Sequence, residues 1–361
     1  MAATLRERPP SIPSPPSTIS VTALACALGV TAAAFWVVAS VRRAMAEGGI
    51  ASAGATIALY GFAAATFLLL IPAVRGLVAA RRARAAIPTD LVTARVETAA
   101  GQSWSGVAIG YAVAALLVVV AAAFMIANDS AVARTFFYLP LIRDSFWLIL
   151  QAFWLNVYIF VIAEIFVLVW GLVVAIARLI PGPAGQPIRL MATVYTDIFR
   201  GLPAIICIYL VGFGLPLTGL PLIGNWPPEW YAILALTLTY GAYVAEVYRA
   251  GIESVHWSQV AAARSLGLSF FQTLRFVVVP QAVRRIIPPL LNDFISLQKD
   301  TALVNVIGAV DAFNQAKIVA SNHFNLSSVT TVAFLFVIIT IPQARWVDRL
   351  LERDQRRTRG G

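Results

Sequence analysis

Five charged or amide side chains interrupt stretches of the chain that are otherwise long and apolar. Glu164 lies in the middle of one stretch, Glu246 in a second, and Asn292, Asp293 and Lys299 in a third. A charge inside a membrane-spanning segment is costly, and it normally faces the interior of a helix bundle or a polar cavity. These five residues are therefore candidates for lining a translocation path. Asn292 and Asp293 come first, because two short polar side chains beside a Pro-Pro pair suggest a widened cavity.

The alternative is that these charges only pair with one another inside the protein. Lys299 precedes Asp300 directly, and Glu246 lies three residues before Arg249, a spacing that places two side chains on one helix face. In another apolar run, Ile188–Leu215, the pair Arg200-Gly201 and the following Pro203 are expected to shape an irregular start of a helix rather than to bind a solute.

Residues suited to catalysis or to holding a cofactor are scarce. The two histidines are far apart in the chain, and both cysteines lie in apolar segments without the spacing of a metal site or a disulfide framework. The only two lysines, Lys299 and Lys317, do not follow a glycine-rich loop, so the chain has no P-loop. We expect no catalytic residue, no metal ligand and no cofactor in this chain.

The composition is that of a polytopic membrane protein. Of 361 residues, 60% are hydrophobic and 12% are charged, and the mean hydropathy is +0.81. A soluble domain carries about 25% charged residues. The net charge of +10 does not indicate nucleic acid binding, because the basic residues gather in short loops beside apolar segments, as the positive-inside rule describes.

The hydropathy pattern predicts an all-α fold with about eight transmembrane helices. About 20 apolar residues cross a bilayer core of about 30 Å. The fourth apolar run is longer than this, so its helix must tilt or project from the membrane. The eight runs are Ile19–Val41, Ile50–Val74, Val107–Ala127, Phe146–Ile180, Ile188–Leu215, Tyr231–Ala250, Leu290–Val310 and Val329–Trp346.

Composition shifts divide the chain into four parts. Residues 1–18 are rich in proline and serine and read as a disordered tail, and 19–145 hold three accessory helices joined in part by a polar loop at 75–104. Residues 146–350 form a core of five helices, and 351–361 form a basic tail.

Charge asymmetry predicts that both termini are cytoplasmic. Eight crossings place both ends on one side, together with the arginines of 75–95, of 256–289 and of the C-terminal tail. The opposite loops are poor in positive charge, since 216–230 has none and 306–326 has Lys317 alone. Arg42 and Arg43 oppose this pattern without outweighing it.

The segment His256–Pro289 reads as two short helices joined by a sharp turn outside the membrane. Ser258 is expected to cap the first helix, which stops at Gly267, because glycine readily takes the left-handed conformation just past a helix end. Ser269, with Gln272 three residues on, has the form of a capping box and opens the second helix. Such a compact shape suits docking on a partner.

This segment resembles the EAA loop of permease subunits in bacterial ABC importers, whose pattern is Glu-Ala-Ala, three residues, Gly, nine residues and Ile-x-Leu-Pro. Val277 and Val279 replace the Ile and Leu, and Ala261 stands where the family has Glu. With Ser258 as the cap, the lost Glu would cost a few tenths to about 1 kcal/mol of local helix stability. The resemblance assigns ATPase coupling to Gln259, Ala261, Ala262, Ala263, Gly267 and Pro280.

Further segments resemble the polar amino acid branch of these permeases, which includes histidine, glutamine and general L-amino acid importers. They are Tyr195–Pro203 (YTDIFRGLP), Ala242–Val255 (AYVAEVYRAGIESV) and Val279–Val304 (VPQAVRRIIPPLLNDFISLQKDTALV). The resemblance covers about residues 146–350, and the three N-terminal spans resemble an extension found in some longer members.

The resemblance implies a bacterial plasma-membrane importer subunit without catalysis of its own. An extracytoplasmic binding protein would deliver an amino acid to a pore formed with a second permease subunit, identical or homologous. A cytoplasmic ATPase dimer would hydrolyse ATP. The intramembrane charges would then line a path for a zwitterion, which needs a partner for its carboxylate and another for its ammonium group.

Two other classes of function remain as alternatives. A secondary transporter or channel for small polar solutes would work alone, but the first three spans do not resemble the last five as internal repeats would. An integral membrane enzyme would need a cluster of His, Cys or paired carboxylates, and two isolated histidines do not supply one.

Overall fold

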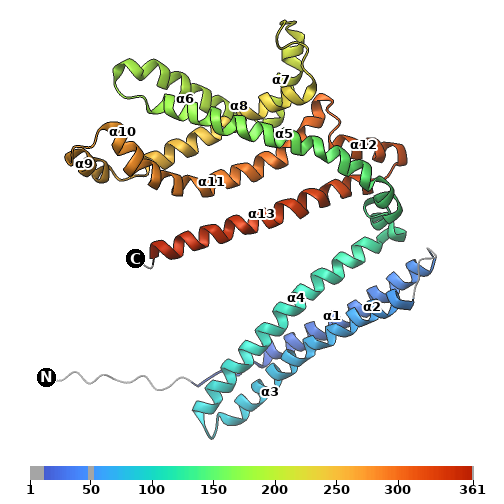
Figure 1. The fold of residues 1–361 in the computed structure, drawn as a ribbon. Coiled ribbons are helices and arrows are strands. Elements are labelled where there is room, and N and C mark those ends of the chain that lie inside the picture. Colours follow the sequence, from blue (N-terminus) through green and yellow to red (C-terminus); the bar gives the residue numbers. More distant parts are fainter. Residues whose placement is uncertain (1–11, 48–52, 360–361) are drawn as a thin grey trace, which may run out of the picture. The chain divides into compact units, whose positions relative to one another are not determined.

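The structure, a computed structural model, describes residues 12–47 and 53–359, and every regular element in these ranges is helical (Figure 1). The predicted all-α class is confirmed. The chain divides into two compact units, Met1–Thr135 and Phe136–Gly361. The first eleven residues of the expected disordered tail lie outside the described residues, and the helix after it begins at Ser17.

The N-terminal unit is built from helices that pack through small residues. They are α1 (Ser17–Glu47), α2 (Ala53–Ala65), η1 (Thr66–Leu69), α3 (Leu70–Ala86) and α4 (Leu91–Phe136). The Ser20 hydroxyl lies 2.9 Å from the Ser105 hydroxyl and donates to the Gly76 carbonyl at 3.2 Å. A Cβ at Gly76 would lie 2.5 Å from the Ser105 Oγ, so glycine permits this close approach.

The expected polar loop at 75–104 is wrong. Helix α3 continues to Ala86, and α4 already begins at Leu91. The Asp90 carboxylate starts α4 by accepting hydrogen bonds from the Val92 and Thr93 amides and from the Thr93 hydroxyl. Arginine, alanine and glutamate are good helix formers, so a helix persists where the chain has become too polar for the bilayer.

The C-terminal unit surrounds a central helix, α8, which contacts α5, α6, α7 and α11. Ile159 and Val167 of α5 are buried in one cluster with Leu236 of α8 and Leu297 of α11. The helices are α5 (Leu139–Leu179), α6 (Gln186–Gly201), α7 (Ala204–Leu217), α8 (Pro228–Glu253), α9 (Trp257–Ser265), α10 (Phe270–Thr273), α11 (Val279–Asp300), α12 (Ala312–His323) and α13 (Ser327–Arg359), with short turns η2 (Pro183–Gly185), η3 (Leu274–Val278, π-helical) and η4 (Thr301–Ile307).

Two expected spans differ from the helices in the structure. The run Ile188–Leu215 is broken into α6 and α7, which bend by 105° at Leu202-Pro203, because proline cannot donate to the preceding turn. The run Leu290–Val310 is the end of α11 followed by η4, and α11 itself starts at Val279. Pro288 and Pro289 lie inside α11 rather than ending a helix.

The count of eight crossing helices is not confirmed. Within the described residues, five helices are long and apolar enough to cross a membrane, or six if the bent pair of α6 and α7 is one span. Helices α8 and α11 are not among them. Both carry charged residues, and α8 buries much of its surface against neighbouring helices, so neither needs to be uniformly apolar.

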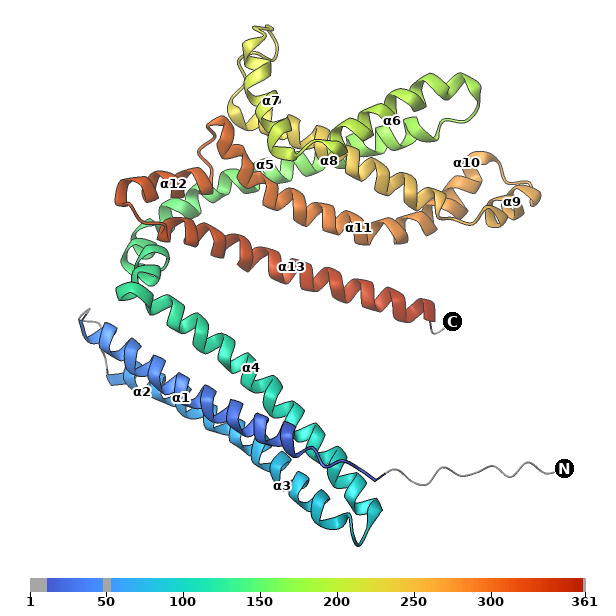
Figure 2. The same cartoon turned by 180° about the vertical axis from the view of Figure 1, so that it is seen from behind.

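Different helices and connections lie at the two ends of the C-terminal unit (Figure 1, Figure 2). Helices α9 and α10, the connection between α5 and α6 and the C-terminal end of α13 lie at one end. Helix α12 and the loop between α7 and α8 lie at the other. There the buried Asn156 amide donates to the Asp311 carboxylate at 2.9 Å, and Asp311 caps α12, so this end is held by a satisfied polar network.

Candidate functional site

A cleft of about 340 Å³ opens between α6, α8 and α11. Charged side chains of both signs line it, together with the aromatic ring of Tyr243. The charged lining residues are Arg200, Glu246, Arg285 and Asp293. One cleft thus offers donors for an anionic group and acceptors for a cationic one.

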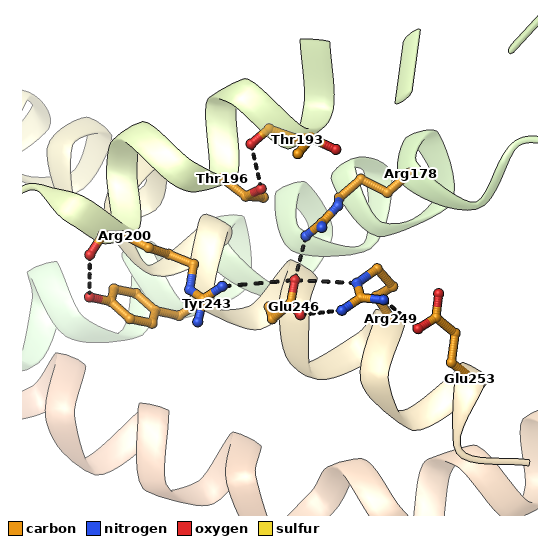
Figure 3. Close-up of polar contacts among 8 residues, drawn as sticks. All are labelled: Arg178, Thr193, Thr196, Arg200, Tyr243, Glu246, Arg249 and Glu253. Carbon is orange, nitrogen blue, oxygen red and sulfur yellow. Dashed lines mark hydrogen bonds and ion pairs between the residues drawn. The ribbon is translucent and has the colours of Figure 1, made fainter. Parts of the chain in front are cut away.

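Glu246 lies at the centre of an ion-pair network on one side of this cleft (Figure 3). Its carboxylate accepts hydrogen bonds from Arg178 at the end of α5 and from Arg249 one turn along α8. The Arg200 guanidinium lies 3.9 Å from the same carboxylate, and Arg249 also pairs with Glu253. The internal pairing of Glu246 with Arg249 that the sequence left open is present. Glu246 nevertheless also lines the cleft.

Arg200 reaches the cleft from the last turn of α6, just before the bend to α7. Its guanidinium lies 5.7 Å from the ring centre of Tyr243, whose hydroxyl donates to the Arg200 carbonyl at 3.1 Å. The sequence assigned Arg200 only a role in shaping the helix start. An arginine beside the Gly-Leu-Pro break of an apolar run was the signal that could have placed it in the cleft.

Asp293 faces the cleft from α11. Its Oδ2 atom is buried and has no hydrogen-bond partner among the residues that the structure describes. The Glu164 carboxylate, on α5, lies within electrostatic reach of Asp293. A buried oxygen without a partner is costly unless a ligand or water satisfies it, so Asp293 is the lining residue with most to gain from a bound cation.

The other two candidates on α11 do not line this cleft. Asn292 and Lys299 are exposed, and Asn292 lies one residue from Asp293, about 100° around the helix. The neighbouring Asp300 accepts a hydrogen bond from the Tyr240 hydroxyl at 2.8 Å. Both residues are polar in the sequence, and the orientation of α11 decides that Asp293 lines the cleft and Asn292 does not.

A second candidate site is the coupling segment, residues 256–289, at one end of the C-terminal unit. Gly267 has φ +84°. Its amide donates to the Arg264 carbonyl at 3.0 Å, and the Leu268 amide donates to the Ala263 carbonyl at 3.2 Å. These two bonds form a Schellman motif, which ends α9 as the sequence predicted.

The capping box of the second helix is confirmed, and the expected cap of the first is wrong. The Ser269 amide donates to the Gln272 side chain at 2.8 Å, and the Gln272 amide donates to the Ser269 hydroxyl at 3.2 Å. Helix α9, however, is capped by His256, whose ring nitrogen accepts from the Ser258 amide. Ala261 is therefore the fifth residue of α9, too far along for a glutamate there to close a capping box.

The coupling segment presents apolar side chains to the outside. Trp257 is 74% exposed and Leu266 is 84% exposed. Gln259, Ala261 and Ala262 are exposed on α9, whereas Ala263 is buried. Pro280 lies in the first turn of α11, after the π-helical turn η3, and is exposed. Exposed aromatic and aliphatic residues on a two-helix projection are typical of a protein interface.

The C-terminal unit contains the whole of a family match. A family described as "Binding-protein-dependent transport system inner membrane component" matches residues 168–359, which include the cleft and the coupling segment. This range leaves the N-terminal unit outside the match.

Several relatives align over most of their own length. The chain is 33% identical to a probable glutamine ABC transporter permease protein of Bacillus subtilis, over 58% of this chain and 94% of the relative. It is 34% identical to a glutamate transport system permease protein of Corynebacterium glutamicum, over 57% and 93%. It is 30% identical to an arginine transport system permease protein of Bacillus subtilis, over 57% and 91%.

A solved structure has a similar fold. It is described as the crystal structure of an amino acid ABC transporter with histidines, and the match has a TM-score of 0.52 and 30% sequence identity. The match covers 60% of this chain and 95% of that one.

Proposed function

Because the chain belongs to the family of binding-protein-dependent transport system inner membrane components, we propose that it carries a polar amino acid through the membrane as the permease subunit of an ABC importer. The observation that carries this proposal is the family match over residues 168–359, a range that contains both the charged cleft and the exposed coupling segment. An extracytoplasmic binding protein delivers the amino acid, and a separate ATPase drives transport.

The coupling segment is the docking site for that ATPase. Its Schellman turn at Gly267 and its capping box at Ser269 hold α9 and α10 in a fixed relation, while Trp257 and Leu266 are exposed for contact. The chain has no P-loop, so ATP is hydrolysed by the partner. The importer contains a dimer of this ATPase and two permease subunits.

The cleft suits an α-amino acid by its charges. Arg200 can donate paired hydrogen bonds to the carboxylate of the substrate, and the Asp293 carboxylate can accept hydrogen bonds from its ammonium group. Glu246 remains paired with Arg178 and Arg249, and these ion pairs fix α5 and α8 beside the cleft. The relatives named for glutamine, glutamate and arginine support a polar side chain on the substrate.

The protein crosses the bacterial plasma membrane with the coupling segment and both termini in the cytoplasm. Arg264, Arg275, Arg284 and Arg285 lie in the coupling segment, and the C-terminal end of α13, at the same end of the unit, carries further arginines (Figure 1). The positive-inside rule places such an end on the cytoplasmic side.

Co-purification with the ATPase tests the proposal. We expect the ATPase encoded beside this chain to co-purify with it, and Gly267→Asp to abolish the association, because an aspartate at φ +84° strains the turn and adds charge to the surface. Gly219→Asp, at an exposed position between α7 and α8 with φ +63° and no heavy atom within 4 Å of its Cβ position, is the matched control outside the coupling segment.

Uptake into vesicles separates this function from a stand-alone transporter. An importer takes up radiolabelled amino acid only with ATP, the ATPase and the binding protein present. Uptake without any ATPase would overturn the proposal in favour of a secondary transporter. Association that survives Gly267→Asp as well as Gly219→Asp would overturn the docking site alone.

A further inference from the structure

A second cleft, of about 270 Å³, lies in the N-terminal unit and takes no part in the proposed transport path. It runs between α3 and α4, and the family match begins only at residue 168. Its lining mixes arginines with apolar surface: Val74, Arg75, Val78, Arg82, Glu97 and Trp104. We propose that this cleft binds the phosphodiester headgroup of an anionic phospholipid.

The cleft lies at the level where the apolar runs of its two helices end, which is the level of the bilayer interface. The apolar helix that begins at Ala53 has crossed a bilayer core after about 20 residues, close to Val74 and Arg75. On α4 the apolar run begins at Val107, just after Trp104. Two independent helices thus place the boundary at the same level, and Arg75 and Trp104 meet there. Tryptophan is enriched at this depth.

Arg75 is oriented to bind a phosphate. Its guanidinium carbon lies 5.0 Å from the centre of the Trp104 ring. Contact with the ring face restricts the guanidinium plane and leaves its N–H groups free to form a bidentate contact with phosphate oxygens. The exposed side of Val74 and Val107, 46% and 40% exposed, continues from this point toward the bilayer core and can contact an acyl chain.

The outer end of the cleft carries a second arginine. Arg82 lies seven residues beyond Arg75, about 10 Å further from the bilayer core. Its side chain is 70% exposed, and it lies 3.9 Å from the Glu97 carboxylate, a loose pair that leaves donors available. Two guanidiniums against one carboxylate give the lining a net positive charge. The exposed Arg81 and Arg84 on the same helix add to it, which favours a lipid with a net negative charge.

Lipid titration of the full-length chain with its partner subunits tests the proposal. In detergent, thermal unfolding is followed while dioleoylphosphatidylglycerol, dioleoylphosphatidylcholine or soluble glycerol 3-phosphate is added, and native mass spectrometry counts retained lipid. We expect phosphatidylglycerol to raise the Tm most. Arg75→Gln with Arg82→Gln should weaken its binding by about tenfold or more, the size expected for losing charged hydrogen bonds.

Matched variants make each outcome decisive. Arg42→Gln removes an exposed arginine near the C-terminal end of α1, which does not line the cleft, and should leave lipid binding unchanged. Arg75→Lys keeps the charge and loses the bidentate fork, so it should bind phosphatidylglycerol with intermediate affinity even if the double variant does not fold. Equal stabilisation by glycerol 3-phosphate would assign the cleft to a soluble anion. The site would be overturned if Arg42→Gln weakened phosphatidylglycerol binding as much as the double variant does. It would also be overturned if neither Arg75→Lys nor the double variant weakened that binding.

Discussion

Arg178, at the end of α5, and Glu246, in α8, form an ion pair that joins two helices of the core beside the charged cleft (Figure 3). Both side chains are mostly buried, with 14% and 24% exposed. Glu246 is shared with Arg249 and lies near Arg200, so one carboxylate holds three arginines in place.

Glu246→Gln should destabilise the permease. Removing one partner of a mostly buried pair leaves the arginines uncompensated, and we expect a loss of about 1 to 3 kcal/mol in the free energy of unfolding. Thermal unfolding of the purified complex measures it. Glu253→Gln is the control, because Glu253 is 51% exposed and, among the residues that the structure describes, its ion pair is with Arg249. Equal Tm values for the two variants would contradict a structural role for the network.

Asp293→Asn should impair uptake without preventing assembly. The substitution removes the negative charge proposed to meet the ammonium group of the substrate, and an ionic hydrogen bond of this kind is worth about 1.5 to 3 kcal/mol, or about tenfold to a hundredfold in uptake. Uptake by reconstituted vesicles measures it. Lys299→Gln, at an exposed position on the same helix, should transport normally. If Lys299→Gln lost uptake and Asp293→Asn kept it, the path would follow the other face of α11.

Ala261→Glu should leave the complex with the ATPase intact or strengthen it. Ala261 is exposed and is the fifth residue of α9, so the new carboxylate cannot close a capping box and should change helix stability little. Any gain in affinity would come from contact between the new carboxylate and the ATPase. Affinity capture of the ATPase by the wild-type chain and by Ala261→Glu measures the difference. Loss of the complex would mean that the ATPase groove requires a small residue here.

Gly171→Ala should overpack the contact between α5 and α8. A Cβ at Gly171 would lie 2.7 Å from Val244 Cγ1 and 3.2 Å from the Ala245 backbone nitrogen. Because backbone on one side cannot yield, we expect a cost of about 1 to 3 kcal/mol in unfolding free energy, visible as a lower Tm. Gly214→Ala, with no heavy atom within 4 Å of the new methyl group, should not lower the Tm. A Tm unchanged by Gly171→Ala would mean that the two helices can separate at little cost.

Acid should fray the start of α4. Hydrogen bonds from the Thr93 hydroxyl and amide and from the Val92 amide hold the pKa of Asp90 below its usual value. A lowered pKa in the folded protein means that this stabilisation is present above about pH 4 and is lost as the pH falls below it. The protection factor of the Val92 and Thr93 amides, which is the intrinsic exchange rate divided by their observed rate at the same pH, should therefore fall in acid. In Asp90→Ala this protection should be low at every pH, and a wild-type protection pattern in that variant would rule out the cap.

The sequence by itself determined the membrane class of the protein and part of the local structure of the coupling segment, although it misplaced the cap of α9. The excess of apolar residues requires a membrane protein, because so few charged residues cannot cover a soluble surface. Gly267 and the pair Ser269 and Gln272 gave the turn and cap of the coupling segment, since these motifs are closed by residues only a few positions apart. A polar composition did not reveal that residues 75–86 and 91–104 are helical, because hydropathy measures partition into lipid and not backbone conformation.

Only the tertiary structure decided which polar residues face the charged cleft between α6, α8 and α11. Asn292 and Asp293 were equal first choices from the sequence, and the rotation of α11 against α8 exposes Asn292 and directs Asp293 into the cleft. Arg200 joins them through the 105° bend between α6 and α7, and Arg178 reaches Glu246 from 68 positions away. Such contacts depend on how helices pack, which the spacing of residues along one helix does not specify.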